Sequence, residues 1–170
     1  MNRRFILSAA LLTPLLIAGC AVSEADLLFS SAGRFSLSGT DAKGKTFAAS
    51  GRYDLRRRAG LTRLDLLTPL HGILARIEVT PDGASLSRSQ DEPPVTAPDA
   101  ETLMRGLLGF SFPVDALELW LGDTRSDFTE YGWRIRILQR FPDGSVKTVR
   151  ASRTLPAVTV TLAVDPRSEP

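Results

Sequence analysis

Few side chains in this sequence are suited to covalent or acid–base chemistry. The chain has one cysteine, Cys20, and one histidine, His71. A zinc site needs three or four ligands, which one thiol and one imidazole do not supply. A catalytic triad needs the histidine beside a serine and a carboxylate, and the sequence has no nucleophile-elbow motif. His71 stands between Pro69-Leu70 and Gly72, a pattern typical of an exposed turn.

Two other classes of function find no support. No glycine-rich phosphate loop is present, and Asp91-Glu92 favours a solvated loop over acid–base catalysis. Arg56-Arg57-Arg58 is the one basic cluster, and no aromatic residues alternate with it as in a nucleic-acid site. The simpler interpretation of this cluster is a solvated strand end. The alternative is that it contacts anionic lipid headgroups or a partner. We therefore expect neither an enzyme nor a nucleic-acid-binding protein.

The position of Cys20 points to a different use of the thiol. A basic start at Arg3-Arg4 precedes a mostly apolar run from Phe5 to Ile17, shorter than the roughly 20 residues of a membrane span. Ala18-Gly19 then precedes the cysteine, which is similar to a bacterial lipobox, although Ile17 replaces the usual leucine. In that motif the thiol is lipidated and becomes the new N-terminus. A plain secretory signal with a chance cysteine is the alternative.

Cleavage before Cys20 would change the charge balance. Residues 1–19 include two of the 21 basic residues, so 19 would remain against 19 acidic ones, in a chain of 151 residues. The high isoelectric point then belongs to the signal and predicts no nucleic-acid partner. With its only thiol lipidated, the chain can form no disulfide. In lipoproteins of this kind, an aspartate directly after the cysteine tends to retain the protein in the inner membrane. Here Ala21 follows the cysteine, so the resemblance implies the outer membrane.

Alternating apolar residues predict strands through most of the chain. The pattern predicts half-buried antiparallel strands separated by turns at 41–44 and 81–83. Helical spacing appears between 98 and 108, and again from Pro113 to Gly122. The strand segments with this alternation are 35–38, 47–55, 63–66, 73–79, 133–137, 146–153 and 158–164.

This order predicts one antiparallel sheet with helices inserted across it, a mainly β (α+β) fold. We divide the chain into a signal peptide (1–19), a lipidated tether (20–32), a single domain (33–165) and a tail (166–170). A brief helix is one possibility in the tether, through Glu24 to Phe29.

The segments from Gly33 to Val164 resemble the LolB family of outer-membrane lipoprotein receptors. The resemblance depends on the order and spacing of several short stretches, none of which is catalytic. These stretches are 64–70, 74–84, 99–104, 108–114, 119–122 and Gly132-Trp133.

The resemblance implies a curved, incomplete antiparallel β-barrel, with short helices covering its open side and an apolar cavity between them. It implies a receptor that accepts triacylated lipoproteins from the soluble periplasmic carrier LolA and inserts them into the outer membrane, without nucleotide hydrolysis. It also implies a monomer anchored on the periplasmic face of the outer membrane, with the lipid on Cys20 as its only bound group.

The inward face of the strands supplies the candidates for contact with acyl chains. The same alternation is expected of a closed, filled core, and only the resemblance favours a cavity. The candidates are Phe35, Leu37, Phe47, Tyr53, Leu64, Leu66, Trp133, Ile135 and Ile137.

The resemblance also assigns a membrane-insertion loop to Pro69, Leu70 and His71, with Leu70 projecting from its tip. The family more often has glycine directly after this leucine, where this chain has His71. A hairpin leucine packed inward is the alternative. Two other functions stay open for the whole chain: a lipid-anchored envelope protein that binds another hydrophobic ligand, and a structural or assembly lipoprotein.

Overall fold

A computed structural model describes residues 26–40, 44–68, 72–88 and 92–166. The described chain forms one sheet of ten antiparallel strands, with two short α-helices and one 3-10 turn between the sixth and seventh strands. The elements are β1 (Leu27–Thr40), β2 (Thr46–Arg58), β3 (Leu61–Thr68), β4 (Gly72–Thr80), β5 (Gly83–Ser87), β6 (Val95–Ala97), α1 (Ala100–Leu108), η2 (Val114–Ala116), α2 (Leu117–Gly122), β7 (Asp127–Glu130), β8 (Trp133–Arg140), β9 (Val146–Arg153) and β10 (Val158–Val164).

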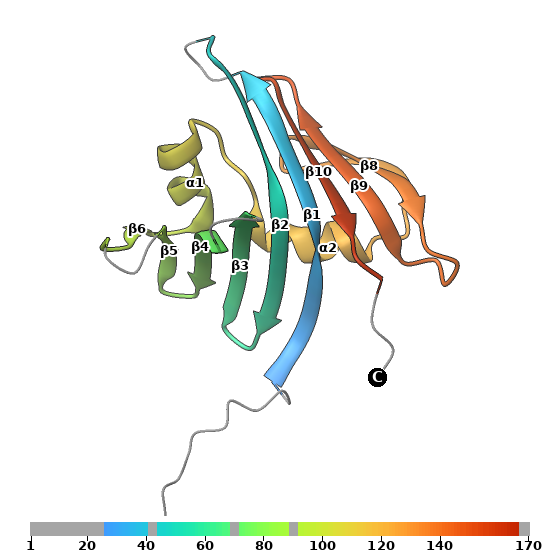
Figure 1. Cartoon of the computed structure of the whole chain (residues 1–170), viewed down its shortest axis with the longest axis horizontal. Coiled ribbons are helices and arrows are strands. Elements are labelled where there is room, and N and C mark those ends of the chain that lie inside the picture. Colours follow the sequence, from blue (N-terminus) through green and yellow to red (C-terminus); the bar gives the residue numbers. More distant parts are fainter. Residues whose placement is uncertain (1–25, 41–43, 69–71, 89–91, 167–170) are drawn as a thin grey trace, which may run out of the picture.

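The sheet is curved and does not close. Its strand order is β6-β5-β4-β3-β2-β1-β10-β9-β8-β7, so β6 and β7 are its two edges. The chain passes from one edge to the other through α1, η2 and α2, which lie across the concave face (Figure 1). The predicted fold class, an incomplete antiparallel barrel with short helices over its open side, is confirmed.

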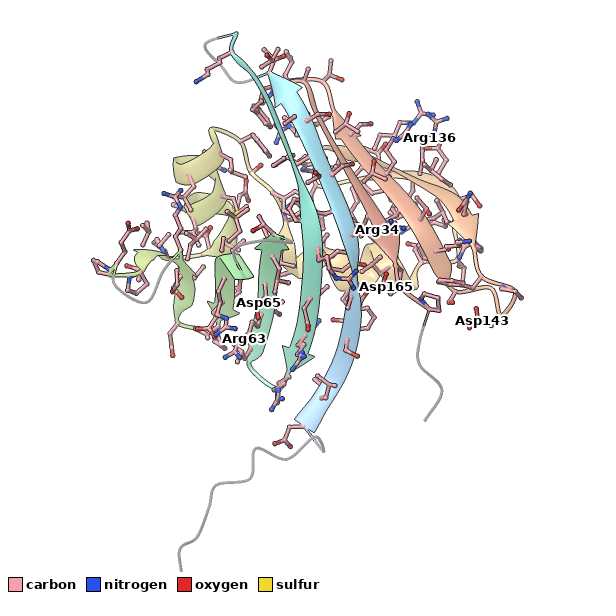
Figure 2. The ribbon with its side chains drawn as sticks, viewed as in Figure 1. Arg34, Arg63, Asp65, Arg136, Asp143 and Asp165 are labelled. Atoms are coloured by element: carbon pink, nitrogen blue, oxygen red, sulfur yellow. The ribbon has the colours of Figure 1, made fainter. Side chains whose placement is uncertain are left out.

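The convex face of the sheet is charged. Figure 2 shows Arg34, Arg63, Asp65 and Arg136 on the face that is turned away from the helices. Residues that are opposite each other on β3 and β4 form ion pairs there, for instance Asp65 with Arg76, whose Nε lies 2.6 Å from Oδ1. Because these charges occupy alternate positions, the residues between them face the concave side.

The concave side holds the hydrophobic core, to which the sheet and the helices both contribute. Helix α1 begins where the Asp99 carboxylate accepts a hydrogen bond from the Thr102 backbone N–H at 2.6 Å. It ends at Gly109, which adopts the left-handed conformation at φ 79°. Between these ends Ala100, Leu103 and Met104 are buried, which fixes α1 against the sheet.

Most of the predicted strands and both helices are found at the expected places. The prediction of a brief helix in the tether is wrong for the described residues, because β1 begins at Leu27 and pairs with β2 from that residue. A run of apolar residues such as Leu27-Leu28-Phe29 suits either structure until a neighbouring strand is present. The alternation also missed three short strands, β5, β6 and β7.

Candidate functional site

The nine residues predicted to contact acyl chains lie in or against the core of the concave face. They come from strands β1, β2, β3 and β8, which the sheet brings together on one side. Phe35, Tyr53, Leu64, Trp133 and Ile135 are buried, whereas Leu37, Phe47, Leu66 and Ile137 are half-buried and packed against that core.

The segment that joins α1 to η2 covers part of this face. Residues 109–113 form neither helix nor strand, and we call them the linker. Its two phenylalanines, Phe110 and Phe112, are buried and point to the sheet. The Phe110 ring stacks on Phe47 at 6.0 Å between centroids, and both phenylalanines meet the Trp133 ring edge-on at 6.1 and 5.5 Å. The linker therefore places aromatic side chains where the sequence predicts acyl chains.

The side chain of Arg153 connects the linker to the sheet by hydrogen bonds. Arg153, at the end of β9, donates from Nη1 to the Ser111 carbonyl oxygen at 3.1 Å and to the Ser111 hydroxyl at 3.3 Å. Its guanidinium also donates to the Leu155 carbonyl oxygen. The guanidinium carbon lies 5.6 Å from the centre of the Trp133 ring, a distance typical of a cation–π contact.

Helix α2 is attached to both halves of the sheet by side chains. Trp120 donates its indole N–H to Glu130 of the β7 edge at 3.1 Å. On the other half, Arg57 of β2 pairs with Glu118 at 2.5 Å. The helix thus crosses the concave face and is attached to the sheet through these side-chain contacts.

An open cavity of about 1300 Å³ lies beside the first residues of β1. Strand β10 pairs with β1 only from Gly33 onward, so the start of β1 has no strand on that side among the described residues. The cavity is bounded by this part of β1, by Leu121 of α2, and by the turn between β8 and β9 around Phe141. None of the nine acyl-chain candidates lines it.

Several predicted sites fall outside the described residues. They are Cys20, predicted to carry the lipid, and the insertion loop Pro69, Leu70 and His71. The described residues on either side of that loop, Thr68 of β3 and Gly72 of β4, are paired with each other. Within the described ranges no cluster of three metal-binding side chains occurs, and no helix there has the length and apolar character to cross a bilayer.

Comparison with known proteins identifies the family. The model of the family described as "Outer membrane lipoprotein LolB" matches residues 28–155. The chain belongs to the LolB family. It is 30% identical to an outer-membrane lipoprotein LolB of Cupriavidus metallidurans, over 99% of this chain and 98% of that protein. It is 31% identical to one of Bordetella petrii, over 88% of this chain and 86% of that protein.

Membership of the LolB family makes this chain an outer-membrane lipoprotein and supports a receptor role there. The family model covers the chain from the second residue of β1 through β9, including the helices, while β10 lies beyond the matched residues. The nine acyl-chain candidates and the covering linker therefore lie within the residues that match the family model.

Two parts of the site were not among the predicted residues. Phe110 and Phe112 alternate with Ser111 between Gly109 and Pro113, which was a usable signal of two aromatic side chains on one face. Arg153 had no such signal, because its contact with Ser111 joins residues 42 positions apart.

Proposed function

We propose that this LolB-family chain is a receptor that accepts acylated lipoproteins from a LolA-like periplasmic carrier and inserts them into the outer membrane. The observation that carries the proposal is the apolar concave face, from Phe35 to Ile135, covered by a linker outside regular secondary structure. Such a face shelters acyl chains, and a cover held by side chains is suited to exchange with them.

The energetics of the cargo fit this arrangement. Each methylene removed from water contributes about 0.8 kcal/mol, so acyl chains do not cross the periplasm without shelter. A receptor must hold them less firmly than the membrane does. A face already filled by Phe110 and Phe112 meets this requirement, since the cargo's gain is reduced by the displaced side chains. The transfer then runs downhill and needs no nucleotide, cofactor or catalytic residue.

Attachment to the membrane belongs to the same proposal. The lipid on Cys20 holds a monomeric receptor on the periplasmic face of the outer membrane. Between Cys20 and the first strand residue, Leu27, an extended chain spans at most about 25 Å, which keeps the domain near the bilayer. The loop of Pro69, Leu70 and His71 follows β3, and Leu70 at its tip is the residue we propose to enter the lipid.

The decisive experiment is transfer of a purified triacylated lipoprotein from its carrier to this protein, without an energy source. A pull-down of the receptor should recover the cargo, and added liposomes should then take it up. A lipophilic fluorescent probe should bind the receptor and be displaced by the same cargo.

Failure of both assays would favour a structural or assembly lipoprotein with a filled core. Probe binding without transfer would favour a receptor for another hydrophobic ligand. Depletion in cells separates the same alternatives, because only loss of a general receptor leaves many unrelated lipoproteins in the periplasm.

A further inference from the structure

The indole N–H of Trp133 is a buried donor without an acceptor. The side chain is 0% exposed, and Nε1 has no hydrogen-bond partner among the described residues. A buried indole N–H normally finds a partner, because leaving it unpaired is unfavourable. The other tryptophan of the chain, Trp120, follows this rule and donates to Glu130. Trp133 is therefore the exception in the same core.

The cover over Trp133 is the linker, which lies outside the helices and strands. Phe110 and Phe112 contact the ring edge-on, and both belong to the linker. The guanidinium of Arg153 lies over the ring and joins the linker through Ser111. Displacement of the linker would uncover an aromatic surface with a free donor at its edge.

We infer that Trp133 Nε1 donates a hydrogen bond to the carbonyl oxygen of an acyl group, an ester or amide of the lipid, when the chain replaces the linker's phenylalanines. This inference rests on the proposed function and specifies which polar part of the cargo is recognised.

The chemistry of the two partners is complementary. An indole nitrogen is a donor only, and the carbonyl oxygen of an ester or amide is an acceptor only. The methylenes next to that carbonyl would take the apolar contacts that Phe110 and Phe112 make now. The exchange keeps apolar contact with the ring and adds a hydrogen bond that Nε1 makes to none of the described residues.

The test compares two fluorescent lipid probes of equal chain length, a diacylglycerol with ester linkages and its dialkyl ether analogue, which has no carbonyl. The parent protein should bind the ester more tightly. In Trp133→Phe, which keeps an aromatic ring, affinity for the ester should fall about five- to tenfold, the size of one hydrogen bond, while affinity for the ether stays the same. Trp120→Phe is the matched control and should keep the ester preference.

The inference is overturned if Trp133→Phe keeps the preference, or if it loses affinity for both probes equally, which indicates packing alone. Should Trp133→Phe not fold, Trp120→Phe gives a second measurement, because Trp133 is then the only tryptophan. Its emission should respond to the ester probe more than to the ether, and equal responses contradict the inference. If the parent binds neither probe, the proposed function itself fails.

Discussion

Arg153 on β9 donates a hydrogen bond to the backbone carbonyl oxygen of Ser111 at 3.1 Å, and this contact joins the linker to the sheet. The same guanidinium holds the Leu155 carbonyl and lies against Trp133. One side chain therefore organises the end of β9, the linker and the aromatic cluster together.

We expect Arg153→Met to lower the free energy of unfolding by about 1–3 kcal/mol, since hydrogen bonds from a charged donor are lost while the aliphatic stem is kept. Backbone amides of the linker should also exchange faster with solvent. Urea unfolding and hydrogen exchange measure the two effects. Ser111→Ala is the milder control, because the carbonyl acceptor remains. Unchanged exchange in Arg153→Met would show that the linker is held by packing alone.

Removal of an aromatic side chain from the linker tests whether the concave face can take a ligand. Phe112 is buried between Trp120 and Trp133, so Phe112→Ala should cost about 3–5 kcal/mol of stability. Affinity for a lipophilic probe should nevertheless rise, because the space of the ring becomes available to it. Calorimetry and probe titration give the two values. The control is Leu119→Ala, at an exposed residue of α2, which should change neither the stability nor the affinity for the probe. Loss of stability with no gain in binding would favour a filled core.

The N-terminal cap of α1 predicts a specific dependence on pH. The hydrogen bond from the Thr102 backbone N–H, followed by that from its hydroxyl, lowers the pKa of Asp99 below its usual 3.8. Because the pKa is lower in the folded state, the ionised carboxylate stabilises the folded protein at pH values above 3.8. This contribution disappears as the pH falls through the folded-state pKa.

Asp99→Asn keeps an acceptor for the cap but does not titrate, so it should be less stable than the parent at neutral pH and equal to it in acid. Asp99→Ala, which has no acceptor for the cap, should be less stable than both the parent and Asp99→Asn at neutral pH. Denaturant unfolding above and below pH 3.8 measures these differences. A constant difference between parent and Asp99→Asn across this range would contradict the assignment.

The parts of the fold that were predictable are those set by local patterns. Strands β2 and β8 alternate because one face is dry and the other wet, and α1 carries its own start and stop signals in Asp99 and Gly109. Strand β7 was missed because Phe128 is its only buried residue, too little for an alternating pattern. Its position depends on pairing with β8, which is a tertiary contact.

The sequence predicted the residues that the sheet contributes to the site, but not the linker that covers them. The concave candidates follow from alternation within single strands. The position of Phe110 over Phe47 depends on how the chain crosses from one sheet edge to the other, which no local pattern encodes. The same holds for the Trp133 indole N–H, because its lack of an acceptor among the described residues depends on everything that surrounds the ring.

Replacement of the predicted lipid-bearing thiol tests the membrane anchor. In cells, Cys20→Ala should abolish incorporation of labelled palmitate and release the protein from the membrane fraction, because an apolar chain is what holds it there. Ala21→Asp is the informative companion: it should keep the label but move the protein to the inner membrane. Labelling and membrane fractionation report both. A Cys20→Ala protein that still takes up palmitate would rule out this residue as the acceptor.

The insertion loop can be separated from cargo binding by one charge. Leu70→Glu should accept cargo from the carrier as the parent does, since Leu70 is not among the residues expected to contact the acyl chains. It should fail to deliver the cargo to liposomes, because a carboxylate resists entry into lipid. The control is Leu155→Glu, a leucine that is 83% exposed in the turn between β9 and β10. It should deliver normally, because the effect is expected of one loop and not of any exposed leucine. Equal delivery by both variants would remove Leu70 from the mechanism, and equal failure would show that added charge alone weakens contact with the membrane.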